Sequence, residues 1–353
     1  MSPEYVTLSR GDADFEPYLL GTFASERRAL PVETFQGPSN SERVTFRVVS
    51  LEKLEIPAWW RVYWRASRPE LALLSMGPAM AAWLNHYGSI SEWSEWPSWF
   101  ALLGIFFLQT AVLLFIDYQD HMQGADRVNR RRGPRVIQKG WVTAVAVRRY
   151  AWINAGVALA FGLPALSMAP FELAVLCAIS AVAILAVTSR WTRRWGLSDL
   201  GFFALFGPLL TTGVALASFA EFTSSDLLLG GVFGATALWV FHVRQFEFLF
   251  RSKAENFRTF LFFFPFDRAK RWVIGETALV ALLQVGVAMN LRVPIEMLAM
   301  VVPVCAPMAW TAYRLSQAIS PLSSSLLSLS RYALAAQAAW ACWWVFSLGL
   351  QWL

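Results

Sequence analysis

"SWFALLGIFFLQTAVLLFIDY", residues 98–118, contains no charged side chain before Asp117. A run of about 20 apolar residues is long enough to cross the hydrocarbon core of a bilayer as a helix. The chain of 353 residues is 56% hydrophobic and only 15% charged, a composition that excludes one soluble domain. We therefore predict an all-α fold, a polytopic membrane helix bundle of about nine transmembrane helices. The predicted windows are 70–87, 98–118, 150–168, 171–189, 199–220, 227–246, 273–291, 295–314 and 332–353.

Basic residues are distributed unevenly between the two sides of these windows. Lysine and arginine gather before the first window and after the second, fourth, sixth and eighth, whereas loops such as "EFTSSD" (residues 221–226) hold acids. Because basic flanks stay on the cytoplasmic side, we predict a cytoplasmic N-terminus in the cell (inner) membrane. This asymmetry and anionic headgroups account for the net charge of +6, so the lipid bilayer is an expected partner and nucleic acid is not.

The N-terminal residues differ in composition from the rest of the chain. Residues 1–58 are of mixed polarity, and "VETFQGPSNSERVTFRVVS" (residues 32–50) offers turn residues followed by a short alternating stretch. We predict a partly ordered cytoplasmic N-terminal extension over residues 1–58 and a transmembrane domain over residues 59–353. The sequence leaves the role of the extension and the oligomeric state open.

The segment "FIDYQDHMQGADRVNRRRGPRVIQKG", residues 115–140, turns from an apolar helix into acids, glycines and arginines. Asp117 and Asp120 are three residues apart, so both side chains lie on one face if the helix continues. Two carboxylates can hold Mg²⁺, which keeps several waters and also takes substrate phosphate oxygens. Arginine suits bidentate contact with phosphate. The pattern is typical of a metal–diphosphate site, but also of a plain helix end with its basic cytoplasmic loop.

The sequence of this segment resembles the first aspartate-rich motif of the UbiA superfamily of intramembrane prenyltransferases. The likeness is greatest to the dihydroxynaphthoate branch, which makes menaquinone precursors. Ile116 departs from the pattern, because the family usually has Asn there. The matching residues are Asp117, Tyr118, Asp120, Gly124, Asp126, Gly133, Pro134, Gln138 and Gly140.

Two other stretches are similar to the same family. "RASRPELALLSMGPAM" (residues 65–80) carries the family's Ala-Arg-Pro at Arg68 and Pro69. "RWGLSDLGFFALFG" (residues 194–207) is similar to its Gly-Leu-Gly-Asp stretch, with Asp199 as the acid. The resemblance covers roughly residues 60 to 350, which is the predicted transmembrane domain.

The family's second aspartate-rich motif corresponds to "FHVRQFEFLFRSKAENFRTFLFFFPFDRAKR", residues 241–271, and here the match weakens. Arg244 matches, Gln245 stands in for the leading Asp, and Glu247 takes over an acidic role. Charged residues recur there at steps of three or four and form one helical stripe. Such a stripe is typical of a salt-bridged, solvated helix face as well as of a functional site. The stripe consists of Arg244, Glu247, Arg251, Glu255 and Arg258.

The resemblance implies a function and assigns roles to these residues. It implies Mg²⁺-dependent transfer of a prenyl group from a prenyl diphosphate to an aromatic acceptor, in quinone or related isoprenoid biosynthesis. The implied catalytic residues are Asp117, Asp120, Arg244 and Glu247. The implied diphosphate-binding residues are Arg135, Lys139, Arg251, Lys253 and Arg258. The implied metal ligands are Asp117, Asp120, Asp126 and Glu247.

Other interpretations of the sequence stay open. Ile116 and Gln245 favour a catalytically degenerate protein that binds isoprenoids or quinones. A secondary transporter of unrelated fold would instead place charged residues near the bilayer midplane. His121 and His242 lie at the cytoplasmic ends of the motif helices, where a lone histidine is more often structural. The sequence leaves the acceptor and the prenyl chain length undetermined.

Overall fold

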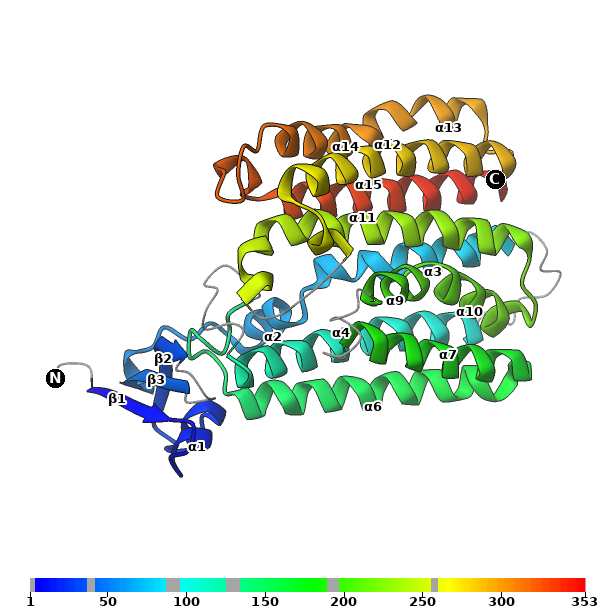
Figure 1. The fold of residues 1–353 in the computed structure, drawn as a ribbon. Helices are drawn as coiled ribbons and strands as arrows, with labels where there is room; N and C mark the ends of the chain where they lie inside the picture. Colours follow the sequence, from blue (N-terminus) through cyan, green and yellow to red (C-terminus); the bar gives the residue numbers. More distant parts are fainter. Residues whose placement is uncertain are drawn as a thin grey trace. The chain divides into compact units, whose positions relative to one another are not determined.

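The computed structural model describes residues 4–36, 42–86, 96–124, 134–188, 197–254 and 260–352 (Figure 1). The chain divides into two compact units, which are described one at a time. Unit 1 comprises Met1–Pro69 and Phe107–Leu159, and unit 2 comprises Glu70–Phe106 and Ala160–Leu353. These units divide the chain differently from the predicted domains, so the boundary after residue 58 stays a prediction.

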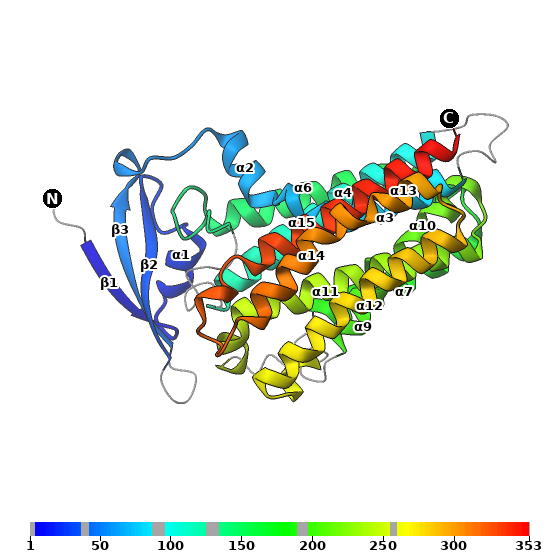
Figure 2. The same cartoon turned by 90° about the horizontal axis from the view of Figure 1, so that it is seen from above.

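Unit 1 begins with a three-stranded antiparallel sheet in the order β1-β3-β2 (Figure 2). The strands are β1 (Glu4–Ser9), β2 (Arg27–Gln36) and β3 (Glu42–Ser50). Residues of β3 alternate between buried and more exposed positions, as the sequence predicts for a strand with one covered face. The covering element is α1 (Phe15–Leu20), whose Phe15 and Leu19 pack on Val44 and Phe46. The described N-terminal residues are thus more ordered than the sequence predicts, because α1 buries one face of the sheet.

The rest of the described chain is mainly helical. Two of its helices, α4 and α6, contribute residues to both units. The helices are α2 (Trp59–Ser67), α3 (Leu73–His86), α4 (Trp96–Met122), α6 (Ala144–Met168), α7 (Phe171–Thr188), α9 (Ser198–Leu205), α10 (Pro208–Phe219), α11 (Ser224–Ala254), α12 (Phe266–Asn290), α13 (Ile295–Ala299), α14 (Val301–Ser316) and α15 (Leu329–Gly349).

Within the described residues, six helical segments are long and apolar enough to cross a membrane. This agrees with a multi-pass helical membrane protein. Three predicted windows fall on α3, α7 and α15, which are not among the six. The count of nine transmembrane helices and the orientation stay predictions. The six segments are Trp96–Met122, Ala144–Ser167, Ser198–Phe219, Ser224–Phe246, Phe266–Asn290 and Ile295–Ser316.

The core of unit 2 is built around α11, which contacts α3, α9, α10, α12 and α15. Buried aromatic side chains of α11, among them Phe233 and Trp239, belong to one cluster with Trp340 and Trp344 of α15. Helices α12, α14 and α15 lie side by side in both ribbon views (Figures 1 and 2). Buried polar groups pair across this core. For example, Gln284 of α12 donates to the Thr236 hydroxyl at 2.7 Å.

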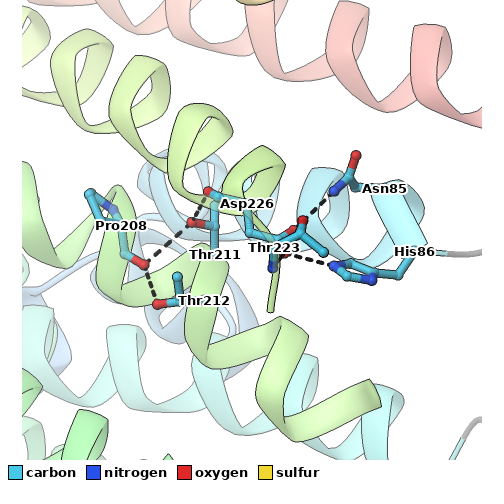
Figure 3. Close-up of polar contacts among 7 residues, drawn as sticks. All are labelled: Asn85, His86, Pro208, Thr211, Thr212, Thr223 and Asp226. Carbon is cyan, nitrogen blue, oxygen red and sulfur yellow. Dashed lines mark hydrogen bonds and ion pairs between the residues drawn. The ribbon is translucent and has the colours of Figure 1, made fainter. Parts of the chain in front are cut away.

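A fully buried acid, Asp226, ties the start of α11 to α3 (Figure 3). Its carboxylate accepts hydrogen bonds from the Thr223 backbone N–H at 2.7 Å and hydroxyl at 3.0 Å, an arrangement similar to a capping box. It also accepts one from the Asn85 amide at 3.1 Å, and it lies 2.7 Å from His86 Nε2. Thr211 of α10 donates to the Asp226 carbonyl oxygen at 2.8 Å. Both carboxylate oxygens are therefore used by the protein itself, which is the pattern of a structural group.

Candidate functional site

The side chain of Asp117 lies in unit 1 against Arg68. Arg68 follows the last residue of α2 in the left-handed conformation (φ 48°), which is uncommon for a residue other than glycine. Its guanidinium forms an ion pair with Asp117 Oδ1, and the two side chains are only 14% and 7% exposed. The second carboxylate oxygen, Oδ2, is buried and has no hydrogen-bond partner among the described residues. Because such an oxygen is costly without a partner, it is suited to accept one from a bound cation or donor.

A basic loop, residues 134–140, follows in the same unit. Arg135 is left-handed (φ 55°), and its carbonyl accepts the Lys139 backbone N–H at 3.0 Å, which closes the turn. Arg135 Nε is buried without a hydrogen-bond partner among the described residues. The Lys139 ammonium lies 4.5 Å and the Arg65 guanidinium 5.3 Å from the centre of the Trp141 ring.

The pKa of Lys139 reflects this gathering of positive charge. Partial removal from water lowers the pKa of Lys139, and the charges of Arg65 and Arg135 lower it further. Three cations that repel one another are stabilised when a polyanion neutralises them. The loop is therefore suited to bind a group such as a diphosphate.

The three-stranded sheet and α1 of unit 1, together called the N-terminal element, contact both the end of α4 and the basic loop. His121 Nε2 lies 3.0 Å from the Leu19 carbonyl oxygen, so this ring bonds to the backbone of the N-terminal element. Gly140 is left-handed (φ 72°), and a Cβ there would come within 2.8 Å of Leu30 Cδ2 on β2. Leu30 would therefore have to shift if a larger residue replaced Gly140 at the end of the loop.

Four of the predicted site residues thus share unit 1, namely Asp117, Asp120, Arg135 and Lys139. Asp120 is half-buried on α4, three residues beyond Asp117. Asp126 lies outside the described residues. In the part of the chain that the structure describes, no group of three or more His, Cys, Asp or Glu side chains could hold a metal ion. A metal here would therefore need ligands beyond the described protein groups, such as water or phosphate oxygens.

The second motif belongs to unit 2, so whether it faces the first motif stays a prediction. Arg244 is half-buried on α11, and Gln245 beside it is buried. The helix continues through the positions of Glu247, Arg251 and Lys253, whose side chains are outside what the structure describes. Arg258 and Glu255 lie outside the described residues altogether.

The structure also brings together polar residues that sequence reasoning did not combine. His242 of α11 lies between two acids: its Nδ1 is 2.8 Å from Glu276 Oε2 of α12, and its Nε2 is 3.3 Å from Asp199 Oδ2 of α9. Glu276 was not singled out in the sequence. The sequence feature that could have pointed to Glu276 is its position inside an apolar window, because an ionisable residue within a membrane helix is costly and usually has a function. The role of Arg68 as the partner of Asp117 was missed as well.

Comparisons with known proteins give a fold but no close relative. No family model matches the chain, and no curated protein matches it. A structure of a digeranylgeranylglyceryl phosphate synthase matches with a TM-score of 0.56 at 12% identity, covering 82% of this chain and 99% of that one. A UbiA homologue from Archaeoglobus fulgidus bound to DMAPP and Mg²⁺ matches over the same shares, with a TM-score of 0.56 at 14% identity. The same homologue bound to GPP and Mg²⁺ matches with a TM-score of 0.55 at 16% identity. The chain shares the fold of these membrane proteins.

Proposed function

We propose that this chain is a UbiA-type prenyltransferase, which uses Mg²⁺ to transfer a prenyl group from a prenyl diphosphate to an aromatic acceptor. The observation that carries the proposal is Asp117 Oδ2, a buried carboxylate oxygen without a partner among the described residues, in the same unit as a basic loop. The fold supports it, because structures of that fold were obtained with prenyl diphosphates and Mg²⁺.

The residues around Asp117 fit a magnesium ion bound together with its substrate. Mg²⁺ commonly uses one or two carboxylates and fills its other positions with water and phosphate oxygens. Asp117 and Asp120 would supply the carboxylates, and Asp126 and Glu247 are the further ligands proposed from the sequence. When bound, the ion would neutralise the negative charge that develops on the leaving diphosphate.

The remaining polar residues would bind and orient the diphosphate. Arg135 and Lys139 provide positive charge at the basic loop. We propose that the diphosphate is also bound by basic residues of the second motif, namely Arg244, Arg251, Lys253 and Arg258. Preorganised cations of this kind stabilise a leaving group in the transition state. Arg68 acts as a positioning residue, because its ion pair fixes one oxygen of Asp117 and leaves the other available.

The biological setting we propose is the cell (inner) membrane, with about nine transmembrane helices and the site facing the cytoplasm. The acceptor class is an aromatic ring of the quinone or a related isoprenoid pathway. The motif sequence around Asp117 supports assigning the chain to the dihydroxynaphthoate branch. An apolar, aromatic-rich surrounding would protect an allylic cation from water.

Product formation tests this proposal. Purified protein in lipid vesicles would be given labelled prenyl diphosphates of several lengths, a panel of aromatic acceptors that includes dihydroxynaphthoate, and either Mg²⁺ or EDTA. We expect a prenylated acceptor with Mg²⁺ and none with EDTA. Asp117→Asn should lose the product, whereas Gln119→Ala, at an exposed position of the same helix, should keep it. Equal product from all three proteins would contradict the site.

A second candidate is a catalytically inactive isoprenoid- or quinone-binding protein. Gln245 favours it, because this buried amide stands where the family has its leading acid. No product, with intact binding of prenyl diphosphate, would make this function the better one. We do not propose a secondary transporter of unrelated fold, since the chain shares the fold of a homologue bound to prenyl diphosphates.

A further inference from the structure

A wide-open cavity of about 1040 Å³ lies on unit 2, lined by residues of α9, α11 and α12, and its lining residues Leu200 and Leu279 are 68% and 57% exposed. Its wall is mostly apolar and includes Leu200, Phe203, Leu238, Leu279 and Leu283. This volume is slightly above the range of about 300 to 1,000 Å³ that is usual for pockets that hold small organic ligands. The cavity is therefore large enough for an extended apolar molecule.

The polar part of this cavity is the cluster of Asp199, His242 and Glu276. One carboxylate lies against each ring nitrogen of His242, and the side chains of Asp199, His242 and Glu276 are 11%, 3% and 12% exposed. All three residues lie inside candidate membrane spans. An apolar cavity with a few convergent polar groups is the usual form of a ligand site.

The charges of the cavity restrict the chemistry of its ligand. Acids lie against both ring nitrogens of His242, and their oxygens accept hydrogen bonds, so this end of the cavity suits a hydrogen-bond donor better than an anion. Arg268 and Arg271 also line the cavity and disfavour a cationic ligand. They precede Glu276 on α12 by one to two turns, about 8 to 12 Å. A hydroxyl group suits either end, because it can donate to a carboxylate or accept from a guanidinium.

On α11, this cavity and Arg244, one of the residues proposed to bind the diphosphate, lie on different faces. With 3.6 residues per turn, positions 244, 247 and 251 of α11 fall roughly 140° to 200° around the helix from position 242. His242 and Arg244 therefore occupy opposite faces of α11. Arg244 does not line the cavity.

We propose that this cavity binds a neutral amphiphile, an apolar chain or ring that carries a hydroxyl group. The hydroxyl group donates to Glu276 or Asp199, and the apolar part lies along Leu279 and Leu283. Gly275 of α12 lines the cavity, and a Cβ built there meets no atom within 4 Å. A side chain at this position would enter the cavity without a clash, which makes Gly275→Leu a blocking variant.

Photolabelling of the full-length protein in phosphatidylcholine vesicles tests the proposal, with a diazirine analogue of farnesol as the probe. We expect labelled peptides from α9, α11 or α12. Farnesol should compete at about tenfold lower concentration than farnesylamine, farnesyl phosphate or squalene. Gly275→Leu should reduce the labelling about tenfold. Glu276→Gln should reduce the difference between the farnesol and squalene concentrations that are needed to compete with the probe.

Gly286→Leu is the matched control, because Gly286 is also an exposed glycine of α12 with no atom within 4 Å of a built Cβ, and it does not line the cavity. It should leave the labelling intact. Labelling that Gly275→Leu does not reduce, or stronger competition by farnesyl phosphate, would overturn the proposal. Asp117→Asn should keep the labelling, so the result is independent of the prenyl transfer proposed above.

Discussion

Asp226 and Asp117 are two buried acids on membrane helices, and they differ in how many of their carboxylate oxygens have partners within the protein. Asp226 is fully buried, and both of its oxygens pair with groups of the protein, from Thr223, Asn85 and His86 (Figure 3). Asp117 is 5% exposed, and only one of its oxygens has a partner among the described residues. Buried polar groups in proteins are almost always paired, so the exception asks for an explanation.

The difference separates a structural acid from a functional one. A saturated carboxylate stabilises the fold and has no capacity left for a ligand. A carboxylate that keeps one buried oxygen available costs free energy in the empty protein and regains it when a ligand binds. The comparison predicts that Asp226 contributes mainly to stability and Asp117 mainly to activity.

The largest expected effect is on stability, from Asp226→Ala. Asp226→Ala would leave groups of Thr223, Asn85 and His86 without their partner, and each buried group left unpaired costs about 1 to 3 kcal/mol. The free energy of unfolding in detergent would be measured by chemical denaturation. Asp267→Ala is the control, because Asp267 is 71% exposed and pairs only loosely with Lys270 at 3.5 Å. Its loss should cost less than about 1 kcal/mol. Equal losses in both variants would remove the structural role of Asp226.

The second effect is on turnover, from Asp117→Asn. We expect prenyl transfer to fall about 10² to 10³-fold, the usual cost of losing one preorganised electrostatic group in a transition state. The loss of unfolding free energy should be smaller than for Asp226→Ala. Turnover per folded molecule would be measured for both variants beside the wild type. Asp226→Ala should keep its turnover per folded molecule, and a reversed pattern would break the comparison.

A smaller effect is expected from Gly140→Ala, which tests whether the N-terminal element holds the basic loop. Alanine is strained at a positive φ, and its Cβ would come within 2.8 Å of Leu30. Together these effects should cost about 1 to 3 kcal/mol and raise the KM for prenyl diphosphate. Gly11→Ala is the control, because a Cβ there meets no atom within 4 Å. An unchanged KM in Gly140→Ala would show that the contact does not position the loop.

The smallest effect concerns the pH dependence of substrate binding. The pKa of Lys139 is lowered from its ordinary value of 10.5 by partial desolvation and by Arg65 and Arg135. Lys139 is charged below its pKa and neutral above it, so it should lose its charge at a lower pH than an ordinary lysine. The KM for prenyl diphosphate should therefore rise by a few-fold on the way to alkaline pH. Lys139→Arg stays charged and should flatten this profile. The same rise in both proteins would exclude Lys139 as its cause.

The sequence could predict what depends on local pattern. Each apolar window is a property of consecutive residues, and a bilayer forces such a segment to pair its backbone internally as a helix. The alternation in β3 was visible for the same reason. Strand β2 was hidden, because Pro31 lacks an N–H and the register shifts between Pro31 and Glu33.

The candidate site could be predicted only in part, because its pairings join residues far apart in the chain. Asp117 and Asp120 stood out as acids at the end of an apolar helix. That Arg68 would take one oxygen of Asp117 is a tertiary contact, and no local pattern encodes it. His242 looked like a lone interfacial histidine, since Glu276 lies on the next helix. The comparison of Asp117 with Asp226 likewise required the structure.

The most direct test of the central claim is a calorimetric titration of Mg²⁺ into the protein in the presence of an unreactive thiolodiphosphate analogue of geranyl diphosphate. If Asp117 Oδ2 holds the metal, the wild type should bind Mg²⁺ together with the analogue. Asp117→Asn should bind it about tenfold or more weakly, and Gln119→Ala should match the wild type. Equal Mg²⁺ affinity in the wild type and in Asp117→Asn would contradict the account.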